Sequence, residues 1–143
     1  MTGSTTRRRL VGVALAACAV TGLTIASAGA ASAATSKNGS VESGEFGMYY
    51  HSDYAGCAFD LIVSDDNFAN DYFRSSTSST CSGQGQTTNN NTASNWNRDV
   101  FEWYVYTGAS HTSLEGSLPV GWYGNFSANY KNAVTSAYWY DAN

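Results

Sequence analysis

The residues that could carry out catalysis are few, and their spacing does not bring them together. His51, Ser52 and Asp53 are consecutive and supply the side-chain types of a hydrolytic triad. In an extended strand, residues two apart point to one face of the sheet, so Ser52 points away from His51 and Asp53. The three side chains therefore do not converge, and we expect the protein not to be an enzyme.

Other catalytic and metal-binding patterns are equally weak. An acidic chain contains carboxylate pairs that resemble glycosidase sites by chance, here Asp65 with Asp66 and Glu102 with Glu115. His51 and His111 are the only histidines of the chain, and neither belongs to an HExxH or Cys-x-x-Cys motif. We therefore expect neither a glycosidase pair nor a zinc site.

Short strands must position these residues, because the sequence is rich in aromatic, Gly, Ser and Asn residues and poor in aliphatic ones. This composition predicts an all-β protein. Alternation of apolar and polar residues predicts strands over residues 46–50, 57–63, 101–106 and 134–140. The odd-numbered residues from Cys57 to Val63 should share one face. Residues 75–88 lack apolar periodicity and are predicted to form a surface loop.

The first 33 residues are predicted to be a signal peptide. Three arginines at positions 7–9 precede an apolar run over residues 10–25, and Ala31-Ser32-Ala33 is typical of a cleavage site. Two other export signals are open, namely a twin-arginine motif at residues 6–11 and a lipobox that ends at Cys18. Each of these signals directs the protein out of the cytoplasm, and we expect a secreted, extracellular protein.

Removal of the signal peptide leaves an acidic chain of one domain. Residues 34–44 are polar and expected to form a flexible leader, and residues 45–143 are expected to form the folded domain. The chain after residue 33 has four basic and eleven acidic residues, so its formal charge is −7. Without a basic patch, we expect no nucleic-acid partner and no membrane partner after signal cleavage. A monomer is expected.

Two cysteines remain after signal cleavage, Cys57 and Cys81. In an oxidising compartment, two such cysteines are expected to form one disulfide. On the chain-entropy model, closing this loop stabilises the fold by about 3–4 kcal/mol. No basic residue flanks either cysteine to lower a thiol pKa, so a structural bond is favoured over a reactive thiol pair.

One hairpin carries the most informative spacing in the chain, Tyr49-x₄-Tyr54-x-Gly56. The glycine can adopt a positive φ angle, and the aromatic rings can pack across the hairpin as it folds back over its own sheet. Residues 106–113 repeat the pattern, with His in place of the second aromatic residue and Ser in place of the glycine. The spacing resembles the βγ-crystallin motif, which implies a βγ-crystallin-like sandwich of two Greek-key motifs.

The resemblance extends to an internal repeat near the end of each motif. Residues 90–96 and residues 132–138, 42 positions apart, share the pattern Asn-x₃-Ser-x-aromatic. In βγ-crystallin motifs, the serine at this place ties the last strand to the folded hairpin. Ser94 and Ser136 are therefore expected to be buried and to hydrogen-bond to the hairpin backbone.

Within that superfamily, two segments resemble the secreted streptomycete metalloproteinase inhibitors. They are Met48–Cys57 and Asn89–Arg98, the second of which ends in Ser-x-Trp-Asn-Arg. The resemblance implies a non-catalytic peptidase inhibitor that holds an extended loop in the cleft of a secreted peptidase. The candidate loop is residues 75–88 around Cys81, which the proposed disulfide would pin to the strand of Cys57. Its central residues are Ser79, Thr80, Cys81 and Ser82. A flexible insertion without a partner is the alternative.

The resemblance to the superfamily also implies calcium-binding turns, in which oxygen ligands from both motifs coordinate the ion. The two corresponding turns are residues 89–94 and 131–136, and their candidate ligands are Asn89, Asn90, Asn132 and Thr135. Ala93 stands where a hydroxyl is wanted, and Lys131 stands where Asp or Asn is wanted. Because each turn has one defect and amides replace carboxylates, tight calcium binding is not expected, and no cofactor is expected.

Two other binding functions are open besides peptidase inhibition. One is a secreted antimicrobial or killer-toxin-like protein, which would inhibit the growth of a neighbouring microbe without binding a peptidase. The other is a structural module associated with the cell wall or its carbohydrate, which would use exposed aromatic side chains. Growth inhibition and polysaccharide binding distinguish these functions from peptidase inhibition.

Overall fold

A computed structural model describes residues 33–140 of the chain. The predicted signal peptide, with its export motifs and Cys18, lies outside the described residues except for Ala33. Within residues 33–140, no helix is long and apolar enough to cross a membrane.

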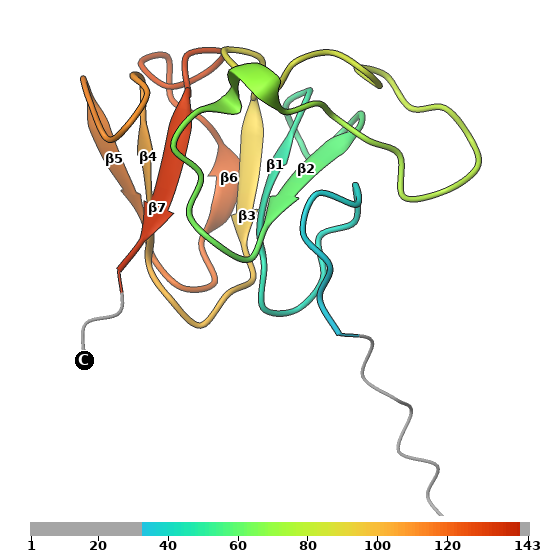
Figure 1. The fold of residues 1–143 in the computed structure, drawn as a ribbon, viewed down its shortest axis with the longest axis horizontal. Coiled ribbons are helices and arrows are strands. Elements are labelled where there is room, and N and C mark those ends of the chain that lie inside the picture. Colours follow the sequence, from blue (N-terminus) through green and yellow to red (C-terminus); the bar gives the residue numbers. More distant parts are fainter. Residues whose placement is uncertain (1–32, 141–143) are drawn as a thin grey trace, which may run out of the picture. The chain divides into compact units, whose positions relative to one another are not determined.

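Two antiparallel sheets make up the described part of the chain (Figure 1). One has the strand order β2-β1-β3-β6 and the other the order β5-β4-β7. A single 3₁₀ turn, Phe68–Asn70, is the helical element of residues 33–140. The strands are β1 (Phe46–Tyr49), β2 (Ala58–Leu61), β3 (Ser94–Asn97), β4 (Trp103–Tyr106), β5 (Glu115–Leu118), β6 (Tyr123–Asn125) and β7 (Ser136–Trp139). The all-β class predicted from composition is confirmed.

The two halves of the chain exchange a strand. β1, β2 and β3 come from the first half, but their sheet is completed by β6, which pairs with β3 from Ser94↔Asn125 to Trp96↔Tyr123. In return, Asp65 of the first half forms an isolated bridge with Ala137 of β7. Each half is therefore a Greek key whose third segment lies in the sheet of the other half, so neither sheet is complete without both.

The first hairpin has shorter strands than the sequence pattern predicts. β2 ends at Leu61, and Val63 is 57% exposed rather than sharing the buried face of Phe59. The reason is the exchange described above, because the chain must leave β2 to reach β7 at Asp65. Likewise β4 begins at Trp103, two residues after the predicted start.

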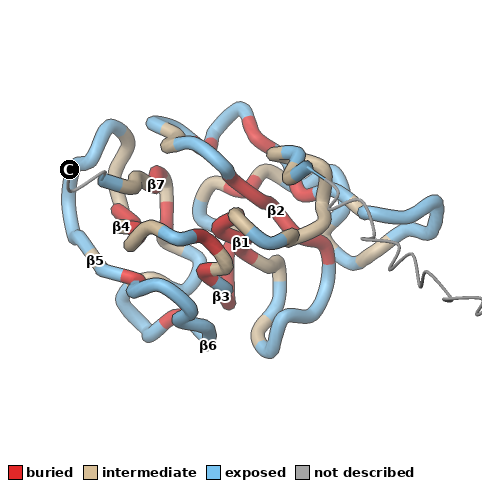
Figure 2. Tube along the Cα trace, turned by 90° about the horizontal axis from the view of Figure 1, so that it is seen from below, coloured by how far each residue is buried: buried red, intermediate tan, exposed pale blue. Residues whose placement is uncertain are grey.

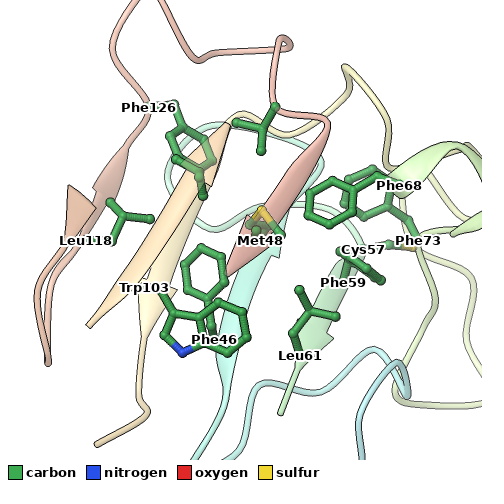
Figure 3. Packing of buried hydrophobic residues seen from close by; sticks show 13 residues of the cluster. Phe46, Met48, Cys57, Phe59, Leu61, Phe68, Phe73, Trp103, Leu118 and Phe126 are labelled. Carbon is green, nitrogen blue, oxygen red and sulfur yellow. The ribbon is translucent and has the colours of Figure 1, made fainter. Parts of the chain in front are cut away.

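The core lies between the two sheets and is mainly aromatic (Figure 3). Phe46 of β1 and Trp103 of β4 are both fully buried, and their rings stack with 5.0 Å between centroids. The indole N–H of Trp103 donates a hydrogen bond to Asp99 Oδ2 at 2.9 Å, so this large side chain is buried without an unpaired donor. Figure 2 shows burial concentrated on β1 to β4 and β7, while β5 and β6 remain largely exposed.

Both hairpins fold back over their sheets as the spacing predicts. In the first, the rings of Tyr49 and Tyr54 meet edge to face at 5.7 Å between centroids, and Gly56 has a φ of +80°. In the second, Tyr106 and His111 lie at 5.2 Å, and Ser113 has a φ of +68°. The second hairpin therefore keeps the conformation of the first although Ser carries a steric cost that Gly avoids.

The two repeat serines hold these hairpins. Ser94 is fully buried; its hydroxyl donates to the carbonyl oxygen of His51 at 2.7 Å and accepts from the N–H of Tyr54 at 3.0 Å. Ser136, also fully buried, donates to the carbonyl oxygen of Gly108 at 2.7 Å. The prediction that both serines bond to the hairpin backbone is confirmed.

The segment before β1 is held against β2, which differs from the flexible leader expected for residues 34–44. The backbone N–H of Lys37 donates to the carbonyl oxygen of Asp60 at 2.9 Å. The N–H groups of Asn38 and Gly39 donate to the two carboxylate oxygens of Asp60 at 3.2 and 2.7 Å. Asp60 is fully buried. A buried carboxylate needs such donors, which explains why a polar segment takes a defined position.

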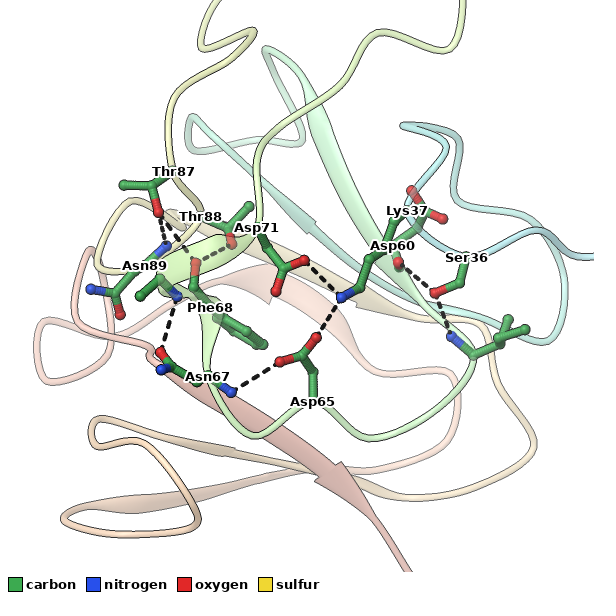
Figure 4. Close-up of polar contacts among 12 residues, drawn as sticks. Ser36, Lys37, Asp60, Asp65, Asn67, Phe68, Asp71, Thr87, Thr88 and Asn89 are labelled. Atoms are coloured by element: carbon green, nitrogen blue, oxygen red, sulfur yellow. Dashed lines mark hydrogen bonds and ion pairs between the residues drawn. The ribbon is translucent and has the colours of Figure 1, made fainter.

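Lys37 connects this segment to two others (Figure 4). Its Nζ lies 2.6 Å from Asp65 Oδ2 and 2.7 Å from Asp71 Oδ1. Asp65 follows β2, and Asp71 follows the 3₁₀ turn, so one ammonium group joins three parts of the chain. Because Lys37 keeps 38% of its side chain exposed, we assign to these pairs a positioning role rather than a large contribution to stability.

Replacement of Ser94 by Ala is expected to lower the free energy of unfolding by about 1–3 kcal/mol, because it leaves a carbonyl oxygen and an N–H of the hairpin without their partner. Urea denaturation monitored by tryptophan fluorescence measures this change. Ser78→Ala, at an exposed loop position, is the control and should leave the midpoint unchanged. Equal midpoints for Ser94→Ala and the control would contradict the role assigned to Ser94.

Stability is predicted to fall as the pH rises through neutrality. Burial raises the pKa of Glu45 to about 7, and the carboxylates of Glu42 and Asp60 act in the same direction. Its folded-state pKa lies above the unfolded value of 4.5, so its contribution is complete below that value and is lost as the pH rises through about 7. Urea midpoints at about pH 5 and about pH 8 measure the loss. Glu45→Gln should reduce the difference, and a midpoint that rises with pH would refute the prediction.

Candidate functional site

The loop between β2 and β3 is tied to the first hairpin on both sides. Cys81 forms a disulfide with Cys57, with 5.2 Å between their Cα atoms, which confirms the predicted bond. Next to it, the N–H of Cys57 donates to the carbonyl oxygen of Ser82 at 2.8 Å. On the other side of the loop, the N–H of Arg74 donates to the carbonyl oxygen of Ala58 at 3.1 Å. The loop therefore leaves the sheet and returns to it beside β2.

Between these anchors the loop is exposed. All residues of the segment 76–80 are exposed, and Figure 1 shows the loop extending away from the sheets at the right of the view. A cavity of about 350 Å³ separates it from the hairpin. The hydroxyl of Ser75 donates to the carbonyl oxygen of Ser79 at 2.6 Å, which closes a turn within the loop itself. The loop is thus supported by its ends and its own turn rather than by packing beneath it.

The four residues predicted as the centre of an inhibitory loop lie at its second anchor. Ser79 and Thr80 are exposed and Cys81 is half-buried. Ser82 is exposed, but its hydroxyl lies 2.8 Å from His51 Nε2 and its carbonyl oxygen accepts from Cys57 as described above. The predicted segment therefore begins as free chain and ends as chain that is fixed covalently and by hydrogen bonds.

The residues that suggested a triad have separate partners. His51 contacts the loop through Ser82, the hydroxyl of Ser52 accepts from Lys131 Nζ at 2.9 Å, and Asp53 Oδ1 accepts from Asn125 Nδ2 at 2.8 Å. Each of these side chains bonds to a different segment of the chain.

One carboxylate of each suggested glycosidase pair has a partner as well. The hydroxyl of Tyr106 donates to Glu115 Oε2 at 2.7 Å, and Asp65 pairs with Lys37. Burial raises the pKa of Tyr106, and its hydrogen bonds to Tyr140 and Glu115 add to the rise. Tyr106 therefore remains a hydrogen-bond donor to Glu115 at ordinary pH.

The two predicted calcium turns lie side by side across the internal repeat. The N–H of Asn90 donates to the carbonyl oxygen of Val134 at 3.0 Å, and the N–H of Asn132 donates to that of Thr92 at 2.8 Å. The hydroxyl of Thr135 donates to Asn90 Oδ1 at 3.3 Å. The structure thus brings Asn90 and Thr135 together, as expected for a calcium site that takes ligands from both motifs.

The reciprocal half of this arrangement is incomplete. Ala93 offers no hydroxyl where its repeat mate Thr135 does, and Lys131 donates its ammonium group to Ser52. Asn89 Oδ1 is buried without a hydrogen-bond partner among the described residues. Within residues 33–140 there is also no group of three or more His, Cys, Asp or Glu side chains placed to hold a metal. The residues fit a weak oxygen site at most.

An exposed aromatic cluster, which the sequence analysis did not single out, lies on the outer face of the larger sheet. Tyr54 lies 6.5 Å from Trp96 and 6.2 Å from Tyr123 between ring centroids, and Trp96 lies 6.4 Å from Tyr123. The guanidinium of Arg98 lies 4.7 Å from the Trp96 ring. Trp96 belongs to β3 and Tyr123 to β6, and the ring of Tyr54 lies near both. Because β6 comes from the other half of the chain, this cluster depends on the strand exchange.

Comparison with known proteins identifies the fold. No family model matches the sequence, and no curated protein matches it. Among solved structures, a domain from work on the evolution of the eye-lens βγ-crystallin domain fold is 14% identical, with a TM-score of 0.53 over 71% of this chain and 89% of that one. The N-terminal domain of protein S is also 14% identical, with a TM-score of 0.50 over 68% of this chain and 97% of that one.

The chain therefore has the βγ-crystallin fold, as the hairpin spacing predicted. The two-motif topology, the folded hairpins and the paired serines agree with that assignment. At 14% identity these structural likenesses establish the fold alone, and the function must be argued from the site.

Calcium is expected to leave the stability of the natural protein unchanged, because Ala93 lacks a ligand oxygen in the first turn and Lys131 places a positive charge in the second. Repair of both defects in the variant Ala93→Ser/Lys131→Asn should create a site, so that millimolar calcium raises the melting temperature by about 5 °C. Thermal denaturation with calcium and with EDTA measures both proteins. Stabilisation of the natural protein by calcium would contradict the prediction, and magnesium at equal concentration is the control for ionic strength.

Proposed function

We propose that the protein is a non-catalytic inhibitor of a secreted peptidase, and that the loop over residues 75–82 enters the cleft of the target. One observation carries the proposal, namely that freely exposed residues run directly into a covalent anchor. Thr80 is exposed, and the next residue, Cys81, is bonded to Cys57. A peptidase can therefore approach Thr80 while the chain beyond it stays fixed to the sheet.

Such an anchor supports inhibition for a physical reason. If the peptidase cleaves the loop near Thr80, the disulfide and the hydrogen bond between Cys57 and Ser82 keep the new N-terminal end in place. The turn between Ser75 and Ser79 holds the other end. The two ends of a cleaved loop that stay in place leave the peptidase slowly and can be rejoined. A loop that is already ordered also loses little entropy on binding.

The composition of the loop bears on the choice of target. Residues 75–80 are all Ser or Thr and carry no charge, so the loop itself brings no strong electrostatic preference to the cleft. The resemblance of Met48–Cys57 and Asn89–Arg98 to metalloproteinase inhibitors makes secreted metallopeptidases the first class to test. Secreted serine peptidases form the second class.

Titration of a peptidase panel tests the proposal. Protein purified from culture medium should reduce the activity of at least one secreted metallo- or serine peptidase linearly to zero near one equivalent. Folded protein that leaves every member of the panel fully active at micromolar excess would refute the proposal. Circular dichroism before the assay establishes that the sample is folded.

Variants then locate the inhibitory surface. Thr80→Asp should weaken inhibition by about tenfold or more, because it places a charge in the centre of the bound segment. Thr112→Asp is the matched control, since Thr112 is an exposed threonine in the second hairpin. Cys57→Ser/Cys81→Ser should turn the inhibitor into a substrate that is cleaved in the loop. Equal inhibition by all three variants would place the interaction elsewhere.

A further inference from the structure

The leader, residues 34–44, touches the first end of the loop, which is formed by Arg74 and Ser75. Gly39 lies at the contact, and a Cβ atom built on it would come within 2.5 Å of the carbonyl oxygen of Arg74. Cβ atoms do not approach other atoms so closely, and the contact between the two backbones therefore requires glycine. Residues 39–41 also line the cavity of about 350 Å³ under the loop, so the leader forms one of its walls.

The leader is itself fixed to the larger sheet. The N–H of Gly39 donates to the buried carboxylate of Asp60 in β2 at 2.7 Å. The side chain of Val41 lies on Gly47 of β1, where a Cβ atom would come within 2.3 Å of it. The guanidinium of Arg98, the residue after β3, donates to the carbonyl oxygen of Val41. Contacts with three neighbouring strands therefore hold the leader in one position.

A second contact joins the leader to the chain that enters the loop. Lys37 Nζ lies 2.7 Å from Asp71 Oδ1 (Figure 4). Asp71 comes three residues before Arg74, whose N–H donates to the carbonyl oxygen of Ala58 in β2 at 3.1 Å. The chain that enters the loop is therefore held by β2 and by the leader together.

The two ends of the loop are held in different ways. The second end is held covalently, because Cys81 is bonded to Cys57. Among the described residues, the first end is attached to the sheet by the hydrogen bond of Arg74 and by no disulfide. The turn between Ser75 and Ser79 lies within the loop and does not attach it to the sheet. Contact with the leader gives the first end a support that corresponds to the disulfide at the second.

We propose that residues 37–41 of the leader are the second anchor of the loop, and that Gly39 is the positioning residue at the contact. The inference rests on the proposed inhibition for its functional meaning. With the leader in place, a loop that is cut near Thr80 keeps both new ends beside the sheet. With the leader displaced, the end before the cut moves away, and the inhibitor becomes a substrate.

Two glycines of the leader provide a matched pair of variants. Gly39 has a φ of +85° and Gly44 a φ of +90°, so alanine carries a similar backbone strain at either position. A Cβ atom at Gly44 meets nothing within 4 Å, whereas one at Gly39 meets the backbone of Arg74. Gly39→Ala should therefore displace the leader from the loop, and Gly44→Ala should not.

A milder variant keeps the test decisive if Gly39→Ala does not fold. Val41→Ala removes the methyl groups that lie on Gly47, so it loosens the leader without adding an atom. Its effects should have the direction expected for Gly39→Ala. A folded Val41→Ala that behaves as the natural protein in both measurements below would contradict the inference.

Amide hydrogen exchange at Arg74 tests the anchor without a peptidase. Arg74 is exposed, and its N–H is protected by the bond to the carbonyl oxygen of Ala58. Its exchange should be about tenfold faster in Gly39→Ala than in the natural protein, and unchanged in Gly44→Ala. The amides of β4, in the other sheet, should exchange equally in all three proteins. Equal exchange of Arg74 in the two glycine variants would overturn the inference, whatever the peptidase panel shows.

A peptidase that the natural protein inhibits tests the role in inhibition. Gly39→Ala should associate at the natural rate, because the exposed residues of the loop are unchanged, but its loop should be cleaved about tenfold faster. Gly44→Ala should resist cleavage as the natural protein does. Faster exchange at Arg74 with unchanged cleavage would overturn the role of the leader in inhibition. If no peptidase is inhibited, the proposed function fails, and the exchange at Arg74 still decides whether the leader anchors the loop.

Discussion

The fold depends on a way to hold each hairpin down over its own sheet. A hairpin in this position has positive φ angles at several residues, including Tyr54, and its backbone groups turn away from the strand ladder. The buried hydroxyl of Ser94 satisfies both a carbonyl oxygen and an N–H of the first hairpin, and Ser136 satisfies a carbonyl oxygen of the second. With the hairpins closed, the two sheets can pack through Phe46 and Trp103.

The candidate functional surfaces follow from that scaffold. The first half of the chain carries an insertion that the second half lacks, and the disulfide holds it beside the closed hairpin. His51, within the hairpin, contacts Ser82 at the base of the loop, so the same hairpin that Ser94 holds also supports the loop. A cavity of about 200 Å³ has another origin, because β5 and β6 belong to different sheets and leave space between them.

Local patterns could be predicted from the sequence, and contacts between distant segments could not. The hairpin corner is encoded within eight residues, from Tyr49 to Gly56, and the disulfide follows from a pair of cysteines. The docking of the leader on Asp60 escaped prediction, because a polar segment gives no sign that a distant carboxylate is buried. Asn95 and Trp122 are ordinary strand and turn residues until the exchange of β6 brings them to one cavity.

The central claim, that a buried serine hydroxyl holds the folded hairpin, is tested most directly by amide hydrogen exchange at Tyr54. Tyr54 is an exposed residue outside the strand ladders, so its N–H has no reason to be protected other than its bond to Ser94. We predict that this amide exchanges as slowly as the amides of β1 in the natural protein, and rapidly in Ser94→Ala. Rapid exchange of the Tyr54 amide in the natural protein would contradict the account.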